Sequence, residues 1–99
     1  MHVVRHDSFA EDVLAAWAYL ATRSPRSAEK LLRRIEETVA LITMFPEGAR
    51  EREDVNPAVR QARVKSMRYL VIYRTVDGRL GLLRLVHGAR DLPAVLRED

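Results

Sequence analysis

The segment RYLVIYRTVDGRLGLLRLVH, residues 68–87, decides the fold of this chain. It contains two apolar, β-rich runs separated by Asp77-Gly78, a pair of residues that favours a type I′ turn between antiparallel strands. The first run, YLVIY, is almost continuously apolar, which is typical of a strand that is covered on both faces. The segment therefore predicts a β-hairpin that forms the middle of a sheet.

The residues around this hairpin predict two more strands. In RQARVKS, residues 60–66, Ala62 and Val64 alternate with polar residues, which is the period of a strand with one solvated face. The polar residues 46–59 include two prolines and a glycine, so we expect a long connection there. His2–Arg5 is a short β-branched stretch and predicts an edge strand.

Two amphipathic helices are expected between the edge strand and the other strands. SFAE, residues 8–11, has the pattern of a capping box, so we predict that Ser8 is the N-cap of a helix that stops near residue 23. Ser24-Pro25 favours a second helix start, and Phe45-Pro46 ends that helix. A link this short folds the two helices back on each other as an antiparallel hairpin.

The tail after residue 90 predicts a short final helix with Asp91 as its N-cap. The expected order is β-α-α-β-β-β(-α), in one domain spanning residues 1–99. We therefore predict an α+β fold, in which a small antiparallel sheet packs on an antiparallel helical hairpin.

Strand periodicity puts apolar side chains on both faces of this sheet. Alternation places Leu83 and Leu85 opposite Leu80, Leu82 and Val86. The two long helices can cover only one face, and exposed apolar surface usually marks an interface between proteins. We expect a different protein to cover the second face, with the C-terminal helix or self-association as the alternatives.

Composition limits the classes of function. The 99 residues include no cysteine, which excludes disulfides and thiolate catalysis. No apolar run approaches the length of a membrane span, and the first residues lack the apolar core of a signal peptide. A soluble cytoplasmic protein is the expectation.

The motifs of metal and nucleophilic chemistry are missing. His2 and His6 have a spacing that brings metal ligands together on a helix, but their segment predicts a strand and a turn. Ser8 and Ser24 are explained as helix caps, and the four glycines are isolated, so no phosphate-binding loop is formed. We expect neither a metal site nor a cofactor.

Basic residues remain as the candidates for function. Residues 60–74 include five basic side chains and no acidic one. The candidate group on and beside the last three strands is Arg60, Arg63, Lys65, Arg68, Arg84 and Arg90, with Tyr73 and His87 near them. Such a group can hold an RNA phosphate, with His87 as general acid or base, or it can grip the acidic side chains of a protein partner. The residues alone leave both hypotheses open.

The ordered set of motifs resembles the RelE/ParE toxin superfamily of type II toxin–antitoxin modules. The resemblance runs from the helix start at Ser8-Phe9-Ala10, through the Phe45-Pro46-x-Gly48 turn, to YLVIYR-TVDGRLGLLRLVHGARD. It implies a small sheet packed on a helical hairpin. It also implies a cognate antitoxin whose C-terminal segment wraps around the toxin, so that contact with DNA is made only through the antitoxin.

The resemblance implies one of two activities. RelE-like members cut messenger RNA on the ribosome, and for that activity the candidate residues are Lys65, Arg68, His87 and Arg90. However, the lysine-rich stretch of those members is here QARVK, and PAVLRED lacks their C-terminal tyrosine. The chain is therefore more similar to the non-nucleolytic ParE branch, whose studied members inhibit DNA gyrase.

The sequence thus predicts a ParE-like toxin that an antitoxin neutralises and that inhibits gyrase when free. The residues expected to contact antitoxin or target are Arg60, Arg63, Tyr73, Arg84 and Arg90. His87 is expected to be structural in this reading. The alternatives are a RelE-like ribonuclease and a degenerate member that only binds its partner.

Overall fold

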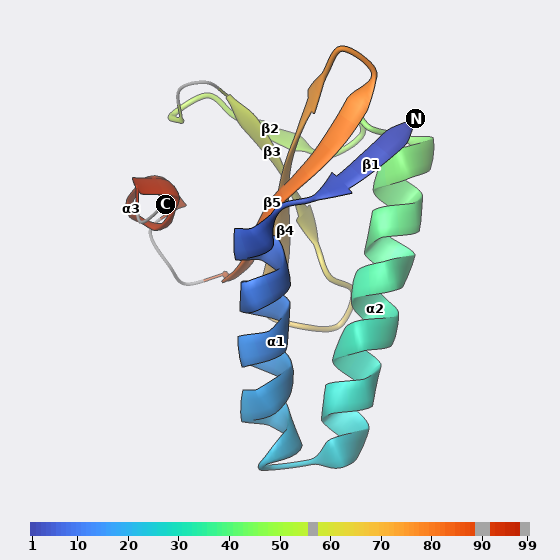
Figure 1. Cartoon of the computed structure of the whole chain (residues 1–99), viewed down its shortest axis with the longest axis vertical. Helices are drawn as coiled ribbons and strands as arrows, with labels where there is room; N and C mark the ends of the chain where they lie inside the picture. The colour runs from blue at the N-terminus through green and yellow to red at the C-terminus, as the bar shows by residue number, and fades with distance from the viewer. Residues whose placement is uncertain (56–57, 89–91, 98–99) are drawn as a thin grey trace.

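The computed structural model describes residues 1–55, 58–88 and 92–97. The elements follow the order β1 (His2–Arg5), α1 (Asp7–Ala21), α2 (Pro25–Met44), β2 (Arg50–Arg52), β3 (Val59–Arg63), β4 (Tyr69–Val76), β5 (Arg79–His87) and α3 (Leu92–Arg97). Helices α1 and α2 lie side by side on one face of the sheet, and α3 lies on the other (Figure 1). The α+β class and the helical hairpin are confirmed.

The sheet has the strand order β1-β5-β4-β3-β2. Strands β2 to β5 form an antiparallel meander, whereas β1 pairs with β5 in parallel, so the sheet is mixed. The central hairpin turns at Asp77 and Gly78, whose φ angles of 50° and 75° are those that a type I′ turn requires. The sequence prediction for this hairpin is therefore correct to the residue.

The two long helices begin differently. Ser24 caps α2 as predicted, since its side chain accepts a hydrogen bond from the Ser27 N–H. The prediction for α1 is wrong, because the helix begins at Asp7 and its N-cap is His6, which forms no side-chain capping bond. The backbone of His6 is already tied to β5 by a bond from its N–H to the Leu82 carbonyl, so the chain enters the helix before Ser8.

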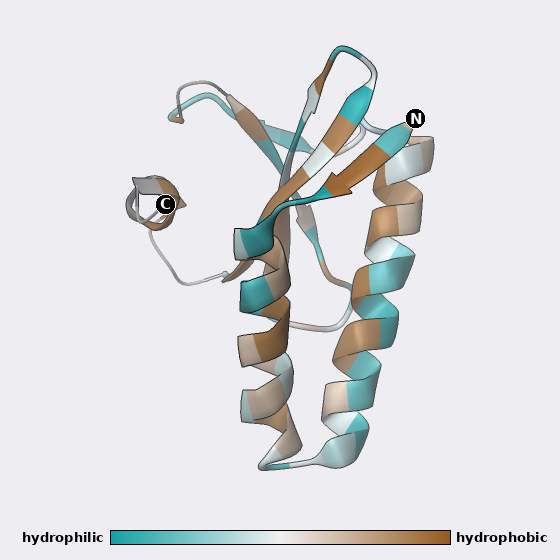
Figure 2. Ribbon diagram, viewed as in Figure 1, coloured by the Kyte–Doolittle hydropathy of each residue, from teal (hydrophilic) through white to brown (hydrophobic). Residues whose placement is uncertain are grey.

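The main core lies between the sheet and the helical hairpin. It joins apolar side chains of both helices to those of the central strands, including Phe9, Leu31, Ile35, Val71 and Leu82, each at most 1% exposed. The side of α2 that faces α1 and the sheet is mainly apolar, while its outer side is mainly hydrophilic (Figure 2). Burial of this apolar stripe positions α2 along the sheet.

A second, smaller cluster occupies the far face of the sheet. Val59, Ile72 and Val86 lie under Leu92 and Val95 of α3, and all five are at most 4% exposed. A second protein is therefore not needed to cover the middle of this face. The C-terminal helix, one of the two alternatives considered from the sequence, covers it.

A β-bulge in β5 changes which residues share a face. Ile72 pairs with Arg84 and Tyr73 pairs with Leu82, so Leu83 is an extra residue in β5. Leu85 consequently packs in the main core, while Leu83 and Val86 pack on the far face. The sequence prediction that Leu83 and Leu85 share a face is wrong, because strict alternation fails at a bulge.

Candidate functional site

Two of the predicted contact residues hold the turn that follows α2. The Tyr73 hydroxyl donates to the Pro46 carbonyl at 2.8 Å, and the Arg60 guanidinium donates to the carbonyls of Glu47 and Ala49 at 3.2 and 2.8 Å. Tyr73 is fully buried, and this burial raises the pKa of its phenol, an effect that the nearby Arg60 charge partly offsets. Both side chains thus fix the turn over residues 46–49, and Tyr73 lines the hollow beside α2 although it is 0% exposed.

Arg84 is also committed inside the chain. It is 6% exposed, and its guanidinium makes a bidentate pair with Asp12 of α1 at 2.7 and 3.0 Å. It donates further to the Val95 carbonyl of α3 at 2.9 Å. The expectation that Arg84 forms a docking surface is not supported, because this side chain ties α1, β5 and α3 together.

The remaining predicted residues divide between two grooves. Lys65 lines a groove beside α2, whereas Arg68 and His87 line another at the ends of β4 and β5, and Arg63 lines both. Arg68 and His87 thus line the same groove, and Lys65 lines the other. Arg90, which belongs to both predicted sets, lies outside the described residues, as does the expected helix cap Asp91.

The first groove, which we call the helix groove, has a volume of about 530 Å³ and lies between the C-terminal half of α2 and strand β3. Its apolar side chains include Leu41, Ile42, Phe45 and Ala62. Leu41 and Phe45 are 60% and 59% exposed, although both are large apolar residues. A soluble surface rarely keeps such side chains in a hollow unless another molecule covers them.

Two unpaired cations stand at the rim of the helix groove. Arg63 and Lys65 are exposed, and neither forms an ion pair or a side-chain hydrogen bond with the part of the chain that the structure describes. The groove therefore combines an apolar interior with a basic rim. The sequence contains a signal for Leu41, because it lies four residues after Glu37 and seven after Arg34, on the polar side of α2. Phe45 was interpreted only as part of the helix stop.

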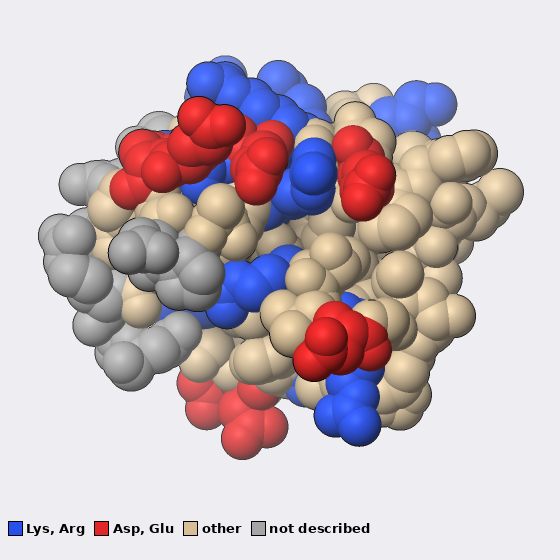
Figure 3. All heavy atoms as spheres, turned by 90° about the horizontal axis from the view of Figure 1, so that it is seen from above, with Lys and Arg blue, Asp and Glu red and all other residues tan. Residues whose placement is uncertain are grey.

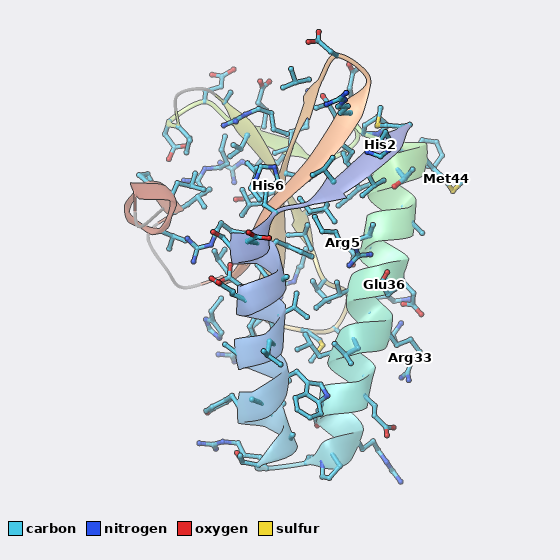
Figure 4. All side chains as sticks on the ribbon, in the orientation of Figure 1. His2, Arg5, His6, Arg33, Glu36 and Met44 are labelled. Carbon is cyan, nitrogen blue, oxygen red and sulfur yellow. The ribbon has the colours of Figure 1, made fainter. Side chains whose placement is uncertain are left out.

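Several other surface charges form ion pairs within the chain. Arg52 donates to Asp54 at 2.8 Å, and this hydrogen bond lowers the pKa of the Asp54 carboxyl. Arg5 of β1 and Glu36 of α2 point toward each other and form two bonds of 3.0 and 2.6 Å (Figure 4). Seen from above, acidic side chains stand among basic ones along one edge of the molecule (Figure 3). Acidic and basic side chains of residues 50–54 therefore share this edge.

Clusters of metal ligands and membrane-spanning helices are absent from the described residues. No group of three or more potential metal ligands occurs among them. None of the helices in the described ranges is long and apolar enough to cross a membrane. His2 is the first residue of β1 and His6 follows its last residue, so the strand lies between the two histidines.

Comparison with known families assigns the fold to a functional class. Residues 3–92 match the family described as the ParE toxin of the type II toxin-antitoxin system parDE. The chain belongs to the ParE toxin family. This membership confirms the resemblance that the hairpin motifs suggested, and it identifies the chain as a type II toxin.

A solved structure gives the same fold. The chain is similar to a chain of the chromosomal ParDE toxin–antitoxin system from P. aeruginosa, with a TM-score of 0.76 and 19% sequence identity. The match covers 88% of this chain and 95% of the other. No curated protein sequence matches this ParE family member.

Proposed function

We propose that this ParE family toxin is neutralised by a cognate antitoxin, a segment of which lies in the helix groove. The proposal rests on one observation: the helix groove holds the exposed apolar side chains Leu41 and Phe45 together with the cations Arg63 and Lys65, which have no ion pair with the described residues. A short amphipathic segment with apolar anchors and acidic side chains complements both features. The similar ParDE structure supports an antitoxin as the partner.

The experiment measures affinity for the product of the adjacent antitoxin gene by calorimetry. Replacing Leu41 and Phe45 with aspartate is expected to weaken binding at least tenfold, because it puts charge where apolar anchors pack. The matched control is Leu14→Asp on α1, which alters an equally exposed leucine, 65% exposed, away from the groove. Equal loss of affinity in both variants would place the antitoxin elsewhere.

We also propose that the free toxin inhibits DNA gyrase. Membership of the ParE family supports this target. The single lysine of QARVK and the lack of a tyrosine in PAVLRED disfavour the ribonuclease alternative. The purified chain is added to a supercoiling reaction and, in parallel, to translating ribosomes. Inhibited supercoiling with intact message is the expected result. Cleaved message with normal supercoiling would sink the proposal in favour of a ribonuclease.

A further inference from the structure

The second groove, which we call the strand-end groove, lies where the β3–β4 connection meets the end of β5. It has a volume of about 590 Å³, within the range of sites that hold a small ligand or one unit of a polymer. Its basic side chains are Arg63 and Arg68, and its rings are Tyr69 and His87. No carboxylate side chain lines it in the described part of the chain.

The two arginines are available for a ligand. Both are exposed, and neither has an ion pair or a side-chain hydrogen bond among the described residues. They differ in this respect from Arg5, Arg52 and Arg84, each of which is paired with a carboxylate. Two free guanidinium groups beside one hollow favour an anion that accepts several hydrogen bonds, such as a phosphate.

The backbone around Arg68 is fixed before any ligand arrives. The Gly88 N–H donates to the Arg68 carbonyl at 2.8 Å, and the Val64 N–H donates to the Tyr69 carbonyl at 2.9 Å. The connection between them turns at Ser66, which has a φ angle of 63°. Because these bonds position Arg68 relative to both neighbouring strands, the ordering cost of binding is reduced.

The rest of the groove is apolar and aromatic. Tyr69 and His87 are cross-strand partners whose rings meet edge to face, with centroids 5.7 Å apart. Met67 and Leu70 add apolar surface. A bare phosphate would leave this surface without a contact, whereas a nucleotide places its base there and its phosphate on the arginines. Bases can reach such a hollow only when they are not paired and stacked in a duplex.

We propose that the strand-end groove binds single-stranded nucleic acid, with a phosphate on Arg63 and Arg68 and an unstacked base against the Tyr69 and His87 rings. This binding does not depend on the gyrase or antitoxin proposals. The proposal is for binding alone, without cleavage of the bound strand. The shared ligand chemistry is a phosphodiester next to an unpaired base, which RNA and DNA both supply.

The test is fluorescence anisotropy with the full chain and labelled oligouridylate, oligothymidylate and a duplex of equal length. The double substitution Arg63→Gln with Arg68→Gln is expected to weaken single-strand binding at least tenfold. It should also reduce the slope of log affinity against log salt by about 0.7, the value for one neutralised phosphate on a single strand. Binding of either single strand supports the site, and the difference between the two reports whether the 2′-hydroxyl is contacted.

Two substitutions serve as matched controls for charge. Lys65→Gln removes a cation that lies two residues from Arg63 in the sequence. Lys65 lines the helix groove and not the strand-end groove. Arg33→Gln removes a cation that points away from the body of the protein on α2 (Figure 4). Both should change affinity less than threefold, and circular dichroism verifies that all variants are folded.

Four results would contradict the proposal. The first is no binding of either single strand, and the second is an equal loss of affinity in the Arg33→Gln control. The third is competition by polyglutamate of matched charge as effective as unlabelled oligonucleotide, which would identify an acidic protein segment as the ligand. Tighter binding of the duplex than of both single strands would likewise contradict the role of the rings.

Discussion

The Asp12–Arg84 pair gives the sharpest test of how the helical hairpin, the sheet and α3 are held together. Asp12 on α1 accepts two bonds from the Arg84 guanidinium, and its Oδ2 also accepts from the Leu85 N–H at 3.0 Å. Arg84 in turn donates to the carbonyl of Val95 on α3. Replacing Asp12 with alanine leaves a buried guanidinium without its counter-charge and a strand N–H without an acceptor.

The expected loss follows from the burial of the pair. Breaking a buried ion pair by removing one partner costs about 3–5 kcal/mol of unfolding free energy. The Arg84 and Asp12 side chains are 8% and 18% exposed, and the partial exposure of Asp12 favours the lower end, about 3 kcal/mol. For a domain of this size that loss lowers the melting temperature by roughly 12–24 °C. It is a large part of a total stability of about 5–15 kcal/mol.

The assay is urea unfolding followed by circular dichroism, with Glu36→Ala as the matched control. Glu36 pairs with Arg5 in the same bidentate geometry, but the two side chains are 61% and 42% exposed. Water screens that pair, so its loss should cost about 1 kcal/mol or less. Both are bidentate arginine–carboxylate pairs, so the contrast measures burial together with the additional bond from the Leu85 N–H to Asp12.

A double-mutant cycle completes the test. Combining Asp12→Ala with Arg84→Met removes the buried charge together with its partner, so the double variant should be more stable than the sum of the single losses predicts, by about 0.5–3 kcal/mol. The reasoning is refuted if Asp12→Ala is no more destabilising than Glu36→Ala. It is refuted equally if the two losses simply add.

Three further substitutions test local features by the midpoint of urea unfolding. Burial raises the pKa of Tyr73 above its ordinary 10.0, so the folded chain holds the phenol proton more tightly than the unfolded chain. Stability should therefore fall as pH rises above 10.0, and Tyr73→Phe should remove that fall while losing the bond to Pro46, about 1 kcal/mol. Ser24→Ala should cost about 1 kcal/mol because the Ser27 N–H loses its cap, with Ser24→Asn as the tolerated control. Gly78→Ala should cost about 1 kcal/mol because its φ is +75°, whereas Gly78→Asn should cost less; equal costs would contradict the turn assignment.

The sequence predicted the parts of the fold that local chemistry determines. The hairpin turn at Asp77-Gly78 and the start of α2 at Ser24-Pro25 depend on residues that are adjacent in the chain, and both are correct. Strand β2 was missed because Arg-Glu-Arg has neither apolar periodicity nor β-branched residues. It forms through pairing with β3, which is a tertiary contact.

The candidate site was harder to predict because its arginines look alike in the sequence. In the sequence Arg84 and Arg63 look alike, since each occupies a strand flanked by apolar residues. The partner that removes Arg84 from the surface is Asp12, 72 residues away. The carbonyls that Arg60 reaches lie 11 and 13 residues before it, in a polar connection. Which arginine is free is therefore decided by contacts that one-dimensional patterns do not contain.

The free cations have an arrangement that links the two proposals. Arg63 is the only side chain that lines both the helix groove and the strand-end groove among the described residues, so it stands on the ridge between them. When an acidic side chain of the antitoxin pairs with Arg63 in the helix groove, Arg63 can no longer bind a phosphate in the strand-end groove. Antitoxin and single-stranded nucleic acid should then bind with negative coupling, which Arg63→Gln should abolish. A coupling that persists in that variant would have to arise from steric overlap instead.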